Sequence, residues 1–93
     1  VGGMKIQEPA TDLAVALATW SSLHERPLPP KTVAIGEVGL AGEVRRVPNL
    51  DRRLAEAARL GYRHAIVPPG DIEVSGIQVR HAATLSEAIA ALT

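Results

Sequence analysis

The stretch that decides the fold, residues 32–47, reads TVAIGEVGLAGEVRRV. Its first four residues are rich in β-branched side chains and predict a strand. Glycines then recur at Gly36, Gly39 and Gly42, and residues 43–47 alternate apolar and charged side chains. Such a pattern predicts a strand followed by a glycine-rich β-hairpin with charge on one face of its second arm.

The segment that follows the hairpin predicts an amphipathic helix. Leu50, Leu54 and Ala57 recur at the spacing of one helical face, while the arginines lie on other faces. We expect Asn49 to cap this helix and Gly61 to end it, since glycine readily adopts the left-handed conformation found beyond helix ends. Residues 64–67 and 77–80 then predict two further short strands.

Two more helices and an initial strand complete the pattern. Residues 10–23 carry almost no charge after Asp12, so we expect a helix buried on nearly every side with Trp20 in the core. Trp20 could instead anchor a contact with another subunit. Thr84-Leu85-Ser86-Glu87 is a capping box that opens a last helix through about Leu92. Residues 4–7 predict a short first strand. The fold class is therefore α/β (α+β), one compact domain over residues 1–93 with a mixed sheet and about three helices.

Composition limits the chemistry that this chain can support. The 93 residues include no cysteine, which excludes disulfides and thiolate metal sites. The three histidines, His24, His64 and His81, share no metal-ligand spacing, so we expect no metal site. No apolar run is long enough to span a membrane and no secretory signal is visible, which favours a cytoplasmic setting and no membrane partner.

Two stretches resemble the proteolytic domain of Lon proteases. They are GEVGLAGEV at residues 36–44, and LDRRLAEAARLG at residues 50–61 leading to AIVP at residues 65–68. The resemblance implies a fold like the C-terminal part of that domain, which cleaves peptides with a serine–lysine dyad. Here Ala10 occupies the position of the serine and Asp51 that of the lysine. An alanine cannot attack a peptide bond and a carboxylate cannot act as an amine base, so we expect no peptidase activity from this segment.

A narrower resemblance rests on VGGMKI at residues 1–6 and EPATDLAVALA at residues 8–18. These are similar to the Lon-like C-terminal region of the RadA/Sms family of bacterial DNA repair proteins. The resemblance implies a larger parent protein with a zinc finger and a RecA-like, DNA-dependent ATPase core, which would bind ATP, magnesium and zinc. It implies that this segment is truncated on its N-terminal side, needs no cofactor itself, and helps a homo-oligomer, such as a hexameric ring, to assemble and to hold DNA during recombination.

An excess of arginine between residues 43 and 63 is the charge feature suited to DNA. Arginine donates two hydrogen bonds to phosphate in a planar fork, so backbone contact independent of sequence is the expected mode. The candidate residues are Arg45, Arg46, Arg52, Arg53, Arg59 and Arg63.

Other interpretations of these residues stay open. The arginines could form a solvated face with local pairs such as Arg52–Glu56, or contact a neighbouring subunit. The module could be purely structural, without any DNA contact. An active peptidase would need a displaced nucleophile such as Thr11 with Lys5 or Lys31 as its base, whereas we expect Thr11 or Asp12 to cap the first helix.

Overall fold

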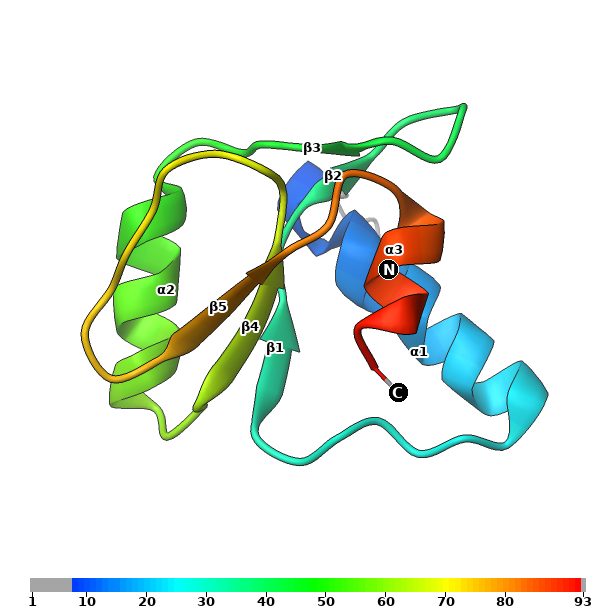
Figure 1. Cartoon of the computed structure of the whole chain (residues 1–93), viewed down its shortest axis with the longest axis horizontal. Coiled ribbons are helices and arrows are strands. Elements are labelled where there is room, and N and C mark those ends of the chain that lie inside the picture. Colours follow the sequence, from blue (N-terminus) through cyan, green and yellow to red (C-terminus); the bar gives the residue numbers. More distant parts are fainter. Residues whose placement is uncertain (1–7, 93) are drawn as a thin grey trace, which may run out of the picture.

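The computed structural model describes residues 8–92 (Figure 1). The strand predicted at residues 4–7 lies outside this range, as does Lys5. The described elements, in chain order, are η1 (Pro9–Thr11), α1 (Asp12–His24), β1 (Thr32–Ala34), β2 (Glu37–Val38), β3 (Val44–Arg45), α2 (Leu50–Arg59), β4 (His64–Val67), β5 (Gln78–His81) and α3 (Leu85–Ala90). The predicted α/β class with three α-helices is confirmed.

The strands form two separate sheets. One is fully parallel, in the order β1-β4-β5, and the other is the predicted antiparallel hairpin of β2 and β3. The chain leaves the parallel sheet at Gly36, whose N–H donates to the Ala10 carbonyl at 3.0 Å. The Gly36 carbonyl accepts from the Leu13 N–H, also at 3.0 Å. Because this backbone bonds to η1 and α1, β2 does not continue the ladder of β1.

Helices cover both faces of the parallel sheet, so the domain has three layers (Figure 1). Side chains alternate between the faces, as expected for strands. One face, with Ala65 and Val67, packs on Leu54 of α2. The opposite face, with Ala34 and Ile66, packs on α1 and α3. The core is therefore two apolar clusters separated by the sheet.

α2 is amphipathic in the predicted sense but begins differently from the prediction. Leu50, Leu54 and Ala57 are its buried residues, and Gly61 beyond its end has a φ of 103°. Asn49 stands at the N-cap position in the left-handed conformation, and its side chain makes no capping hydrogen bond. The expectation that the Asn49 side chain caps the helix is therefore wrong, because Asn49 lacks the extended backbone that a capping residue normally adopts.

α1 is less buried than its sequence indicates. Leu13 and Leu17 are buried, whereas Val15 is 61% exposed and Leu23 is 76% exposed. Trp20 is only half-buried and stacks on the His24 ring with centroids 4.9 Å apart. The expectations of an all-round buried helix and of a core Trp20 are both wrong for the described part of the chain, because α1 contacts the sheet and α3 on one side only.

α3 is fixed by its capping box, as predicted. The Thr84 hydroxyl accepts from the Glu87 N–H at 3.1 Å, and the Glu87 carboxylate accepts from the Ala83 N–H at 2.7 Å. The helix ends at Ala90 rather than at Leu92. Its start also holds the hairpin, because the Val44 N–H donates to the Ala83 carbonyl at 2.9 Å.

Candidate functional site

The two positions that correspond to the protease dyad lie at the starts of η1 and α2. Ala10 is 5% exposed and belongs to the same apolar cluster as Leu50, the first residue of α2. Asp51 is exposed, and its carboxylate accepts from the Arg52 N–H at 2.9 Å. The Glu8 carboxylate lies 3.3 Å from the Arg53 guanidinium, which also joins the two helix starts. These two positions therefore present a buried methyl group and a solvated carboxylate.

Thr11 does not meet Lys31 in this fold. The Thr11 hydroxyl donates to the Glu8 carbonyl at 2.8 Å, close to Gly36 beyond the carboxyl end of β1. Lys31 precedes the amino end of β1, so the length of this strand, on the order of 10 Å, separates the two residues. The Thr11 side chain also makes no N-cap bond, and Asp12 accepts instead from the Val38 N–H at 3.2 Å. The expectation that Thr11 or Asp12 caps α1 is wrong, because Asp12 ties α1 to β2.

The six candidate arginines are spread over the hairpin and both ends of α2. Arg45 lies on β3, Arg46 follows it, and Arg52 and Arg53 stand at the start of α2. Arg59 ends α2, and Arg63 precedes β4. Because the helix separates its two ends by about 15 Å, the set divides among the hairpin and opposite ends of α2.

Three of these arginines pair with carboxylates. Arg45 pairs with Glu43 at 2.6 Å, Arg59 with Glu56, and Arg53 with Glu8. Hydrogen bonds from Arg45 and Arg59 lower the pKa of Glu43 and of Glu56, respectively, below the ordinary value of 4.5. The expected Arg52–Glu56 pair is replaced by Arg59–Glu56.

The other three arginines have no ion pair within residues 8–92. Arg46 donates to the Pro69 carbonyl at 3.3 Å, and Arg63 donates to the Tyr62 carbonyl at 3.1 Å. Arg52 lies with Asn49, Arg53 and Glu56 around an open hollow of about 580 Å³ at the start of α2. This hollow is the place where two of the candidate arginines come together.

The three histidines lie in different parts of the fold. His24 ends α1, His64 begins β4, and His81 ends β5 with its Nδ1 2.9 Å from the Pro68 carbonyl oxygen. Within residues 8–92, no group of three or more His, Asp or Glu side chains is placed to hold a metal ion. The same range contains no helix long and apolar enough to cross a membrane.

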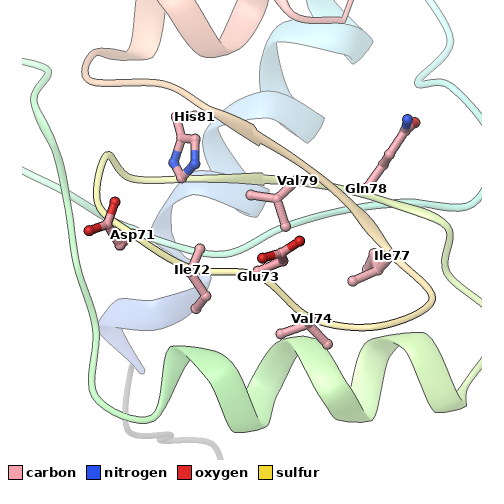
Figure 2. Close-up of a pocket in the computed structure, with 8 residues that line it drawn as sticks. All are labelled: Asp71, Ile72, Glu73, Val74, Ile77, Gln78, Val79 and His81. Carbon is pink, nitrogen blue, oxygen red and sulfur yellow. The ribbon is translucent and has the colours of Figure 1, made fainter.

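Two surface features were not found from the sequence. The outer side of α1 carries a shallow hollow of about 400 Å³ lined by Val15, Ala18, Thr19, Ser22 and Leu23. A second, larger hollow of about 720 Å³ lies between β5 and the loop before it, with Asp71, Glu73 and His81 around it (Figure 2). The alternation of Asp71, Ile72, Glu73 and Val74 was visible in the sequence, but a pattern alone does not show which strand a loop lies beside.

Comparison with known proteins finds two kinds of match for this chain. Residues 2–71 match the family model described as "ChlI: Subunit ChlI of Mg-chelatase". Proteins named "DNA repair protein RadA" are similar over much of the chain. The identity is 60% over 70 residues for Mycolicibacterium smegmatis, covering 75% of this chain and 15% of that protein. It is 52% over 90 residues for Mycobacterium tuberculosis H37Rv, covering 96% and 19%.

The Escherichia coli K12 protein of the same name is 48% identical over 92 residues, which cover 96% of this chain and 20% of that protein. The chain therefore spans about a fifth or less of the length of the curated relatives that it matches. None of these descriptions mentions Lon proteases, so that resemblance stays a prediction.

Proposed function

This chain is a RadA-family segment that belongs to the family described as subunit ChlI of Mg-chelatase, and from this premise we propose that it is a non-catalytic assembly module of a RadA-type DNA repair protein. The observation that carries the proposal is the uncharged outer face of α1. In this proposal the partner is a second copy of the same protein, in a homo-oligomer such as a ring. The ATPase activity and the zinc finger, with ATP, magnesium and zinc, belong to the rest of the longer protein.

The outer face of α1 has the composition of a subunit contact. From Leu13 to Leu23 the helix contains no charged residue. Val15 and Leu23 are exposed there, and small side chains lie between them. A helix that is apolar on nearly every side is usually buried, and exposed apolar patches commonly mark interaction sites. The sequence pattern of a buried helix is thus explained if another subunit covers this face.

The replaced dyad supports the non-catalytic part of the proposal. Ala10 offers no nucleophile, and Asp51 offers no amine base. Thr11 and Lys31 lie toward opposite ends of β1. We therefore expect no turnover of casein or small peptides. Turnover that disappears in Thr11→Ala would favour the alternative of an active Lon-type peptidase.

The assembly proposal is tested by oligomer mass. The variant Val15→Lys/Leu23→Lys adds two charges to the α1 face, and mass photometry of the longer RadA-type protein should show loss of its oligomer. A matched control is Leu40→Lys/Leu60→Lys, because Leu40 and Leu60 are 108% and 63% exposed and lie outside α1. The control should keep the oligomer. An oligomer unchanged in both variants would overturn the proposal.

A second candidate function, contact with the DNA backbone, is favoured by the hollow at the start of α2. Arg52 and Arg53 lie there beside the positive end of the helix dipole. The planar guanidinium groups suit phosphate oxygens, and no base-specific contact is needed. The binding would then be salt-dependent and independent of sequence. We name this candidate second because Arg53 already pairs with Glu8.

Charge reversal distinguishes DNA contact from subunit contact. Arg52→Glu/Arg53→Glu should weaken binding of the longer protein to duplex DNA and reduce its salt slope, while its oligomer mass stays intact. Arg26→Glu/Lys31→Glu makes the same change of charge away from α2 and should affect binding less. Loss of oligomer mass in the first variant would assign these arginines to a subunit contact, as the purely structural interpretation requires. Unchanged affinity and salt slope would remove the DNA role.

A further inference from the structure

The outer edge of β5 has no strand beside it within residues 8–92. β4 is its neighbour on the other side, with Gln78 N–H donating to the Arg63 carbonyl and Ala82 N–H to the Val67 carbonyl, both at 2.8 Å. Backbone groups alternate in direction along a strand, so those of Val79 and His81 point away from β4. Unpaired edges of this kind are where extended peptides add to a sheet.

A groove runs along this edge. The connection from β4 to β5 passes beside β5 rather than over it, and the space between them is the open cavity of about 720 Å³ (Figure 2). Figure 2 shows Val79 pointing from β5 into this space. Ile72, Val74 and Val79 pack against the apolar cluster of α2, which gives the groove an apolar floor. A volume of this size is within the range of sites that bind small ligands and peptide segments.

The charge of the groove is negative. Asp71 and Glu73 both line it, and neither carboxylate has an ion pair or a hydrogen bond among the described residues. They lie two positions apart, which corresponds to about 7 Å along an extended chain. Arg46 lines a neighbouring hollow together with Asp71 and Glu73, and its guanidinium donates to the Pro69 carbonyl. The one imidazole that lines the groove belongs to His81, and its Nδ1 is already bonded to the Pro68 carbonyl.

We propose that an extended basic peptide segment binds in this groove as an additional strand on β5. Its backbone bonds to the outward N–H and carbonyl groups of Val79 and His81. Alternate side chains are basic and meet Asp71 and Glu73, and the side chains between them are apolar and meet the floor. This proposal is independent of the assembly role of α1 and of the DNA role of α2.

Charge decides between this occupant and two others. DNA is disfavoured because two unpaired carboxylates would face its phosphates. A second copy of this chain, paired β5 to β5 with Arg80 at the two-fold axis, would set Arg80 opposite the Arg80 of its partner. Like charges placed opposite one another destabilise strand pairing. A basic peptide meets carboxylates instead of phosphates, and Asp71 and Glu73 outnumber Arg80, the one arginine of β5.

The test uses the 93-residue chain with blocked heptapeptides as probes. A peptide of alternating Lys and Val should bind and should slow hydrogen exchange at the Val79 and His81 amides, as measured by NMR. The matching peptide of alternating Glu and Val should bind at least about tenfold more weakly, since both of its ion pairs become repulsive. Methylation of the peptide nitrogens that face β5 should abolish binding. Binding that survives this methylation would overturn the proposal.

Variants of the groove complete the test. Asp71→Asn/Glu73→Gln keeps the shape of both side chains and should weaken binding of the Lys peptide roughly threefold to tenfold, as expected for two exposed ion pairs. Glu25→Gln/Glu37→Gln removes the same charge from residues that line neither this groove nor the hollow beside it, and should leave the affinity unchanged. Equal weakening in both double variants would show nonspecific attraction and overturn the proposal. Protection of Val79 and His81 that rises with protein concentration alone would also overturn it and would assign the edge to a second copy.

Discussion

Replacement of Gly36 by alanine should destabilise the domain by a steric effect alone. Gly36 is buried between β1 and β2, and its φ is not among the positive values found at other glycines. A Cβ atom there would lie 2.9 Å from the Val44 Cγ1 atom, and 3.6 Å from both Leu13 and Pro68. All three neighbours are buried. The added methyl group therefore enters a filled part of the core.

The expected cost follows from these contacts. Overpacking by one methyl group typically costs about 1–3 kcal/mol. Val44 has little freedom to move away, since β-branched side chains are stiff at χ1 and its backbone is bonded to Ala83. We expect a loss of about 2 kcal/mol in the free energy of unfolding. For a domain whose total stability is on the order of 5–15 kcal/mol, this is a large fraction.

Urea denaturation followed by circular dichroism measures this loss. The midpoint should fall while the slope with denaturant stays constant. In the double variant Gly36→Ala/Val44→Ala the clashing methyl group is gone, so the loss should be smaller than the sum of the single losses. As a control, Gly42→Ala has open space around the new methyl but a φ of 86°, and should cost about 1–2 kcal/mol from backbone strain. A Gly36→Ala stability within 0.5 kcal/mol of the original, on the scale of ordinary surface changes, would refute the steric reasoning.

Three further predictions concern stability. Thr84→Ala should cost about 1 kcal/mol because the bond to the Glu87 N–H is lost, and Thr84→Ser should restore most of it in the same urea titration. Leu54→Ala should cost about 2–5 kcal/mol by leaving a cavity beneath α2, and a loss under 1 kcal/mol would contradict this packing. The lowered pKa of Glu43 means that its pair with Arg45 stabilises the fold above pH 4.5 and that this contribution disappears as pH falls toward the lowered pKa. The free energy of unfolding of Glu43→Gln should therefore change less with pH, between 4.5 and the lowered pKa, than that of the original chain.

The sequence predicted those elements whose cause is local. β4 was expected at residues 64–67 and is found there, and the capping box starts α3 as predicted. The end of α2 before Gly61 was predicted because glycine readily adopts the left-handed conformation that follows the last turn of many helices. Each of these features is determined by residues that lie only a few positions apart in the sequence.

The errors concern residues whose surroundings are set by distant parts of the chain. The composition of α1 indicates full burial. Its exposure, however, depends on how many layers of the fold surround it, and the spacing of apolar residues along the helix does not show that number. Asp12 was expected to cap its own helix and instead binds the Val38 N–H, because the hairpin folds back onto α1. Arg52 and Arg59 are close in the sequence, yet α2 places them at its opposite ends. The groove beside β5 could not be predicted because it is formed by the path of the loop rather than by any residue type.

The parallel arrangement of β1, β4 and β5 also constrains how the chain can fold during synthesis. β2 and β3 are close in the sequence, so they leave the ribosome at almost the same time and can pair at once. β1 has no such neighbour, because the hairpin and all of α2 must be made before β4 can pair with it. At ordinary rates of about 5–20 residues per second, β1 waits for a second or more as an unpaired strand. Since β5 and α3 come later still, a ribosome-bound chain interrupted after α2 lacks the parallel sheet, and chaperone contact during synthesis should fall on β1.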